Sequence, residues 1–87
     1  MTERVVILDI RETILGFFRE KGITGDLGYD TDLFRGGYVN SLFALEVIVF
    51  IERTFSIRVP NKDISESNFQ TIDSIARVVE KNVGGRK

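Results

Sequence analysis

The spacing of apolar residues along the chain predicts helices. Near the N-terminus these residues recur mainly at intervals of three and four positions, which indicates an amphipathic helix over residues 2–21 with a stripe of Ile7, Ile10, Ile14, Phe17 and Phe18. Gly22 is expected to end this helix, because glycine readily adopts the left-handed conformation that closes one. A last helix follows a Thr71 cap, and its stripe consists of Ile72, Ile75, Ala76, Val79 and Val83.

A third periodic segment lies between these two. Asn40 is a good N-cap for a helix from Ser41 to about Phe55, whose core-facing stripe would be Ala44, Val47, Ile48, Ile51 and Phe55. Pro60 cannot continue a helix, and residues 61–69 are expected to hold one short helical turn. The loop at residues 22–40 contains five of the eight glycines and should be pinned to the core by Leu27, Leu33 and Phe34. The pattern predicts an all-α fold with three main helices, a minor one and a long first loop.

The second helix has more apolar residues than one core stripe needs. Leu42, Leu45 and Val49 fall on a nearly opposite face, at positions i, i+3 and i+7. One interpretation is purely structural: a small bundle covers the helix more fully, or the leucines are isolated surface residues without a function. We favour an exposed patch that is kept for a partner. Its acidic neighbours would suit a partner with a basic rim around an apolar groove, and they are Glu46, Glu52, Asp30 and Asp32.

Ser41 opens this helix, and the composition limits what it can do. Taken alone, a serine in the first turn is usually just a helix-start residue. The chain of 87 residues contains no histidine and no cysteine. Ser41 therefore has no imidazole to activate it as a nucleophile, and disulfides and thiolate metal sites are excluded. If Ser41 reacts, another enzyme must supply the base, so it is a candidate modification site where a phosphate would be stabilised by the helix N-terminus.

Charge and length narrow the class of protein further. A net charge of −1 provides no basic footprint for nucleic acid. No apolar run is long enough to span a membrane and the N-terminus does not resemble a signal peptide, so we expect a cytoplasmic protein. The length is that of one domain. We place this domain at residues 1–83, followed by a flexible tail at residues 84–87.

One long stretch of the chain resembles a known family. DLFRGGYVNSLFALEVIVFIERTFSIRVP, residues 32–60, is similar to the acyl and peptidyl carrier proteins. The matching features are the Ser-Leu of the family's Asp-Ser-Leu motif, an acid five residues after the serine, the aromatic residue ending the second helix, and a Pro turn: Ser41, Leu42, Glu46, Phe55 and Val59-Pro60. SNFQTIDSIARVVE resembles the family's entry into its last helix, so the likeness covers most of the chain, from about residue 4 to 82.

The resemblance implies a four-helix acyl-carrier-type bundle in which Ser41 bears a 4′-phosphopantetheine arm. The thiol of that cofactor would hold an acyl group as a thioester, and the chain itself would be no enzyme. The implied docking residues are Asn40, Leu42, Leu45, Glu46, Val49 and Glu52. The implied partners are a phosphopantetheinyl transferase, an acyl-loading enzyme and downstream synthase or tailoring enzymes. A monomer that binds neither nucleic acid nor membrane is expected.

Asn40 departs from the family, which has aspartate at this position. Asparagine caps a helix about as well as aspartate, but the lost charge would weaken recognition by transferases that read it through a basic residue. GYVNSLFAL resembles discrete carriers of polyketide extender units of the glyceryl, hydroxymalonyl or methoxymalonyl type. The D-alanyl carriers, in which Gly-x-x-Asp-Ser occurs, are the alternative. Less favoured are a helical interaction module that dimerises through the surplus stripe and a DNA-binding domain, whose recognition helix would expose Arg, Lys or Asn.

Overall fold

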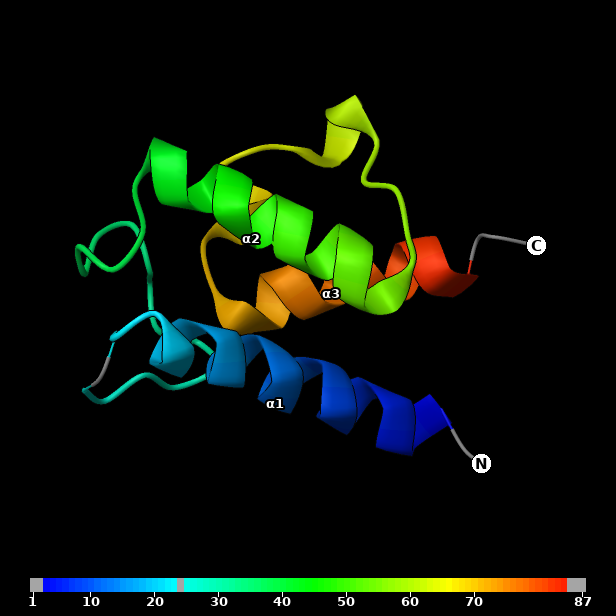
Figure 1. The fold of residues 1–87 in the computed structure, drawn as a ribbon, viewed down its shortest axis with the longest axis horizontal. Coiled ribbons are helices and arrows are strands. Elements are labelled where there is room, and N and C mark those ends of the chain that lie inside the picture. The colour runs from blue at the N-terminus through cyan, green and yellow to red at the C-terminus, as the bar shows by residue number, and fades with distance from the viewer. Residues whose placement is uncertain (1–2, 24, 85–87) are drawn as a thin grey trace.

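Three α-helices follow one another along the chain. The computed structural model describes residues 3–23 and 25–84, with side chains described at 10–23 and 25–83. The helices are α1 (Glu3–Glu20), α2 (Ser41–Phe55) and α3 (Ile72–Gly84), with two short 3₁₀ turns, η1 (Asn61–Asp63) and η2 (Ser67–Phe69), between α2 and α3 (Figure 1). The described residues contain no strand. The all-α acyl-carrier-type prediction is confirmed, with two 3₁₀ turns where one short helical turn was expected.

The predicted start of the first helix and the predicted start of the C-terminal tail lie near the ends of the described residues. Gly84, which was expected to begin the tail, is the last residue of α3. The rest of the expected tail, residues 85–87, and the first residue of the predicted first helix, Thr2, lie outside the described residues.

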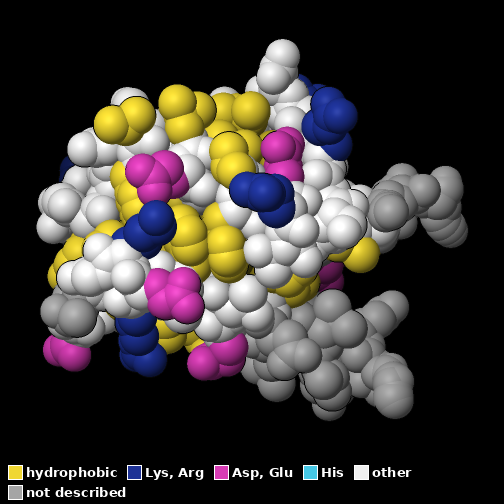
Figure 2. All heavy atoms as spheres, in the orientation of Figure 1, with side chains coloured by type: hydrophobic (Ala, Val, Ile, Leu, Met, Phe, Trp, Pro, Cys, Tyr) yellow, Lys and Arg dark blue, Asp and Glu magenta, His cyan; other side chains and the backbone are white. Residues whose placement is uncertain are grey.

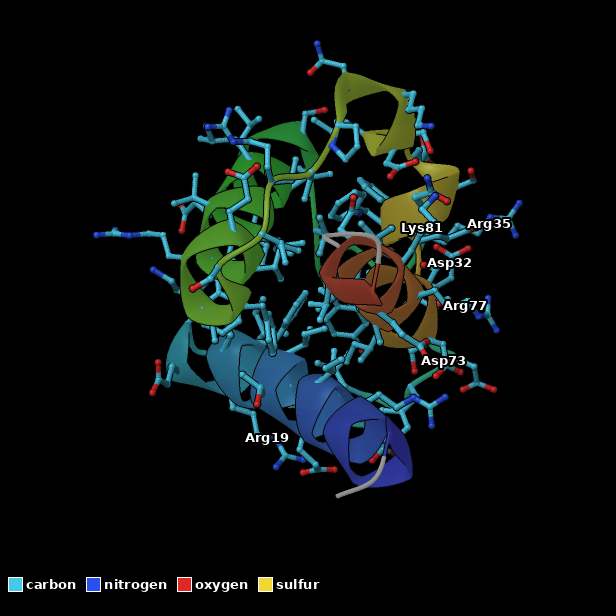
Figure 3. The ribbon with its side chains drawn as sticks, turned by 90° about the vertical axis from the view of Figure 1, so that its right-hand side faces the viewer. Arg19, Asp32, Arg35, Asp73, Arg77 and Lys81 are labelled. Atoms are coloured by element: carbon cyan, nitrogen blue, oxygen red, sulfur yellow. The ribbon has the colours of Figure 1, made fainter. Side chains whose placement is uncertain are left out.

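The core lies where the three helices meet. α3 packs against both α1 and α2, and in Figure 3 the helices are seen to surround it. The predicted stripes supply most of the buried helical residues: Ile10, Ile14, Phe18, Val47, Ile48, Ile51, Ile72, Ile75, Ala76 and Val79. Phe17, Ala44 and Phe55 are partly buried, and the Ile7 side chain lies outside the described residues. Leu15 and Val78 widen the predicted stripes, whereas Val83 is exposed.

The long first loop is pinned to this core. Leu33 is fully buried, and its N–H donates to the Gln70 carbonyl at 2.8 Å. The Tyr38 and Val39 N–H groups both donate to the Leu33 carbonyl, which closes the loop on itself. Leu27 and Phe34 pack partly against the core. The prediction that the apolar residues of the loop fasten it is confirmed, and a fastened loop gives α2 a fixed starting point.

The segment between α2 and α3 is held by a buried carboxylate. α2 ends at Phe55 and is capped by Ser56, which has the left-handed φ of 55° and donates its N–H to the Glu52 carbonyl. Further along, Asp63 is only 4% exposed and its carboxylate accepts a hydrogen bond from Lys81 Nζ at 2.9 Å. This hydrogen bond lowers the pKa of Asp63, since it favours the charged form. The pair anchors η1 to the end of α3.

Candidate functional site

A tight glycine turn delivers the chain to the start of α2. Gly37 has a φ of +79°, in the left-handed region that side chains disfavour. A Cβ on Gly36 would lie 2.6 Å from the Tyr38 ring, so this position has room only for hydrogen. The two glycines let the loop reverse just before Asn40 and Ser41. This explains the Gly-Gly pair ahead of the serine in physical terms.

Asn40 caps α2 as predicted. Its backbone is extended and its side-chain Oδ1 accepts a hydrogen bond from the Phe43 N–H at 2.8 Å. Ser41 is the first helical residue and is exposed, and its hydroxyl makes no hydrogen bond with the described residues. Among the same residues, no acceptor is found for the N–H groups of Ser41 and Leu42. Two free backbone donors and a free hydroxyl therefore lie together at the positive end of a helix.

The surplus apolar face of α2 is exposed, as the sequence predicted. Leu42, Leu45 and Val49 are 70%, 58% and 50% exposed. Figure 2 shows apolar side chains gathered over the α2 side of the molecule, with single charged residues among them. We call these three residues the α2 patch. Exposure of three large apolar residues on one helix face is typical of a surface that contacts a partner.

The acidic residues expected around the α2 patch are differently placed. Glu52 is half-buried and its Oε2 accepts a hydrogen bond from the Val59 N–H at 2.9 Å. It therefore holds the segment after α2 against the helix. Glu46 lies 3.3 Å from Lys21 Nζ, an ion pair that links α2 to the end of α1. Both glutamates of α2 thus have partners within the chain, which leaves little free negative charge on this helix.

The two aspartates of the first loop also differ in their surroundings. Asp30 is exposed. Asp32 accepts hydrogen bonds from the Arg35 N–H at 3.0 Å and from Gln70 Nε2 at 2.8 Å. The Arg35 hydrogen bond, together with that from Gln70, lowers the pKa of Asp32. Asp32 is therefore a structural residue that joins the first loop to the chain just ahead of α3.

A groove opens beside Ser41, between α2 and the chain at residues 64–69. Its volume is about 240 Å³, and its lining includes Ser41, Leu45, Ile48, Ile64, Glu66 and Phe69. The far wall of this groove was not predictable from the sequence. Residues 61–69 carry no helical or strand period, so no pattern signalled that Ile64 and Phe69 would face α2. The only sequence signal was the two apolar residues themselves, Ile64 and Phe69, in an otherwise polar segment.

Comparison with known proteins identifies the family. The chain is 33% identical over 76 residues to the D-alanyl carrier proteins of Streptococcus pyogenes serotypes M5 (strain Manfredo), M49 (strain NZ131) and M1, a match covering 85% of this chain and 95% of each relative. The chain belongs to the carrier protein family. No family model and no solved structure matches it.

Membership of the carrier protein family agrees with the chemistry of the site. The chain has neither histidine nor cysteine, and the described residues hold no cluster of acidic side chains that could bind a metal ion. Among the described residues that line the groove with Ser41, Glu66 is the only ionisable one, and no hydrogen bond joins it to the Ser41 hydroxyl. None of the helices in residues 3–23 and 25–84 is long and apolar enough to cross a bilayer.

The surroundings of Ser41 fit the phosphopantetheine group that the carrier protein family implies. The exposed hydroxyl can be reached by another enzyme, and the free N–H groups of Ser41 and Leu42 suit a phosphodiester. The adjacent groove offers apolar walls to part of a flexible chain, at Ile48, Ile64 and Phe69. The group would supply the thiol that the chain lacks.

Proposed function

We propose that this protein carries an aminoacyl group, D-alanine in the first instance, as a thioester on a 4′-phosphopantetheine arm attached to Ser41. The observation that carries the proposal is the free, exposed Ser41 hydroxyl at the first position of a capped helix. The match to carrier proteins over 85% of the chain supports it.

Other serines are less suited to hold the arm. Ser74 exchanges hydrogen bonds with Thr71 in the first turn of α3, so its hydroxyl is engaged. Ser65 and Ser67 hydrogen bond to each other at 3.3 Å. Ser56 lies at the other end of α2, where exposed carbonyl groups would repel a phosphate. All five serines lie within the described residues, and among them only Ser41 combines exposure with the N-terminus of an α-helix.

The proposed cargo rests on the named relatives. They are D-alanyl carrier proteins, which supports the D-alanyl alternative ahead of the polyketide extender units suggested by GYVNSLFAL. The partners would then be a phosphopantetheinyl transferase, an ATP-dependent enzyme that activates the amino acid and loads the thiol, and a downstream acceptor. The α2 patch, with Asn40 and Glu46 beside it, is the surface we assign to the first two.

The test has two stages, so that attachment and cargo are judged separately. In the first stage, the protein is incubated with coenzyme A, Mg²⁺ and a broad-specificity phosphopantetheinyl transferase. Intact mass should rise by one phosphopantetheinyl group, and Ser41→Ala should remove the gain. If Ser41→Ala still accepts the group, the attachment site is wrong.

In the second stage, the loaded protein is offered D-alanine with ATP and a D-alanine-activating ligase, or a malonyl-type thioester with its acyltransferase. We expect a hydroxylamine-labile D-alanyl adduct and little transfer of the malonyl-type group. Efficient loading of the malonyl-type group alone would leave the arm on Ser41 intact but replace the cargo. The extender-unit hypothesis would then be the correct one.

A further inference from the structure

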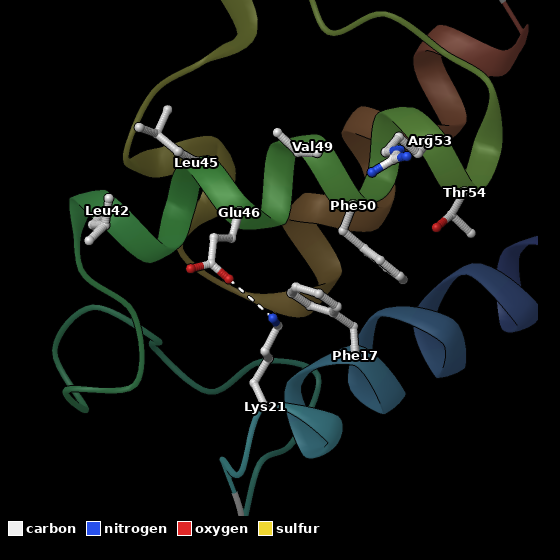
Figure 4. A pocket seen from close by; sticks show the side chains of 9 residues that line it. All are labelled: Phe17, Lys21, Leu42, Leu45, Glu46, Val49, Phe50, Arg53 and Thr54. Atoms are coloured by element: carbon white, nitrogen blue, oxygen red, sulfur yellow. Dashed lines mark ion pairs between the residues drawn. The ribbon is translucent and has the colours of Figure 1, made fainter.

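A second and larger groove runs between α1 and α2. Its volume is about 520 Å³, and Leu45 separates it from the groove beside Ser41, since this residue lines both. The rings of Phe17 and Phe50 lie between the two helices, stacked with their centroids 4.2 Å apart (Figure 4). Along the α2 side the groove is lined by the α2 patch. An aromatic pair beside exposed aliphatic residues gives this groove apolar contact area that the fold itself does not use.

The free charge of the groove is positive. Three charged side chains line it: Lys21, Glu46 and Arg53. Lys21 and Glu46 form an ion pair at 3.3 Å and largely compensate each other. Among the described side chains, no carboxylate forms an ion pair with the exposed Arg53 guanidinium. The sequence had suggested an acidic surface for a basic partner, whereas the described side chains leave one cation, Arg53, without an ion-pair partner at this groove.

We propose that the groove binds an amphipathic helix of a partner protein, which packs apolar side chains on Phe17 and Phe50 and places an acidic side chain on Arg53. The spacing of the α2 patch supports a helix. Leu42 and Val49 are seven residues apart, which is about 10 Å along the axis of α2. Apolar anchors at i, i+3 or i+4, and i+7 of a bound helix cover the same length.

Charge complementarity selects this occupant over a second copy of the chain. A symmetric dimer would place the same surface patch on both subunits. Each Arg53 would then face a groove in which Glu46 is the only carboxylate among the described lining residues, and Glu46 is already paired with Lys21. An acidic partner meets no such competition. The groove shares the α2 patch with the surface assigned above to the transferase and the loading enzyme, and to that extent this inference rests on the proposed function. The groove requires no arm on Ser41, so failure of the peptide to bind would leave attachment of the arm to Ser41 unaffected.

The experiment uses two synthetic helical peptides as probes. They share one stripe of leucines at i, i+3 and i+7, and the flanking positions carry Glu in one peptide and Lys in the other. Each is titrated into the ¹⁵N-labelled full chain without the arm, and amide shifts are followed by NMR at low ionic strength. We expect the Glu peptide to bind about fivefold or more tightly than the Lys peptide, with the largest shifts near Phe17, Phe50 and Arg53.

Two charge-reversed variants make the test specific. Arg53→Glu should abolish or invert the preference for the Glu peptide. Arg77→Glu is the matched control, because Arg77 is exposed on α3, points away from α2 (Figure 3), and changes the net charge by the same amount. If Arg77→Glu acts as strongly as Arg53→Glu, the effect is one of net charge and the proposal fails.

Three other outcomes would also overturn the proposal. Equal or tighter binding of the Lys peptide would show that Arg53 does not select the partner. Shifts confined to Ser41, Ile64 and Phe69 would place the peptide in the other groove. A concentration-dependent dimer, seen by sedimentation, that shifts the same amides without peptide would assign the groove to a second copy of the chain.

Discussion

Two helices of this protein begin with a capping residue and a serine, yet the two serines are in different situations. At the start of α3, the Ser74 N–H donates to Thr71 Oγ1 at 2.9 Å, and the Thr71 N–H donates to Ser74 Oγ at 3.0 Å. This is a closed, reciprocal cap. At the start of α2, Asn40 binds the Phe43 N–H and the Ser41 hydroxyl is left free.

The difference follows from position within the first turn. Ser74 is the third residue of α3, from which a side chain reaches back to the N–H of the capping residue. Ser41 is the first residue of α2, and its side chain makes no such hydrogen bond to the N–H of the capping residue. A serine near a helix start is therefore structural or available according to its place in the turn. Residue type alone does not distinguish the two roles.

The two helix starts are also physically connected. The Leu33 N–H donates to the Gln70 carbonyl, and Gln70 Nε2 donates to Asp32 Oδ2, both at 2.8 Å. Gln70 directly precedes the Thr71 cap, while Asp32 and Leu33 belong to the loop that leads to Asn40. The start of α3 thus supports the loop that presents Ser41. A rigid support for an available hydroxyl is what a modifying enzyme needs.

The largest contrast is expected when the two serines are changed separately. Ser41→Ala should lose all transfer of phosphopantetheine while its melting temperature stays close to wild type, because its hydroxyl holds nothing in the fold. Ser74→Ala should keep the transfer but lose about 1 kcal/mol of unfolding free energy with its cap. Intact mass and thermal melts on both variants check this. Loss of stability in Ser41→Ala, with none in Ser74→Ala, would reverse the comparison.

The cap of α2 can be tested on its own. Asn40→Ala should cost about 1 kcal/mol, within the range of about 0.5–2 kcal/mol for N-cap losses, since the Phe43 N–H loses its acceptor. Asn40→Asp should fold at least as well as wild type, because it caps equally and its charge suits the helix N-terminus. Urea unfolding measures both. A stable Asn40→Ala would mean that the Asn40 hydrogen bond contributes nothing net.

Asn40→Asp should also change the kinetics of modification. With a transferase that presents a basic residue here, kcat/KM should rise by up to about fivefold, because one exposed charge pair contributes at most about 1 kcal/mol. The gain should shrink as salt is raised. A slower reaction with Asp would indicate a transferase adapted to the neutral amide. An unchanged rate would show that the transferase does not recognise the charge at this position.

The smallest effect is expected for the acid sensitivity of the melting temperature, which depends on Asp32, the residue that links the two helix starts. The folded-state pKa of Asp32 is lowered, so its stabilising contribution is present above the unfolded-state pKa of about 3.9 and is lost as the pH falls through the folded-state pKa. Asp32→Asn should therefore lose less melting temperature than wild type when the pH drops from about 6 to about 3. The control is Asp30→Asn, on an exposed neighbour. Equal acid sensitivity of Asp32→Asn and wild type would exclude this role.

Local patterns predicted much of this molecule. The period of the apolar residues found the three helices, Asn40 was predicted as the cap of α2, and the surplus residues Leu42, Leu45 and Val49 are exposed. Each of these features depends on residues a few positions apart, whose side chains share a helix face or turn.

Contacts between distant segments could not be predicted in this way. Glu52 was assigned to a surface rim, but the left-handed turn at Ser56 brings the Val59 N–H back to its carboxylate. The stacking of Phe17 on Phe50 depends on how α1 lies beside α2. Asp63, in a segment without a helical or strand period, accepts a hydrogen bond from Lys81, which is 18 positions away in α3. Tertiary packing determines these contacts, and no single-segment pattern signals them.

The central claim is that Ser41 carries the arm, and the most direct test is the mass of the protein purified from its native host. Intact mass spectrometry should show one added phosphopantetheinyl group, with or without cargo, and fragmentation should locate it on Ser41 in the peptide containing GYVNSLFAL. A chain of unmodified mass under conditions where the host makes it, or a group located on Ser56, Ser65, Ser67 or Ser74, would contradict the account.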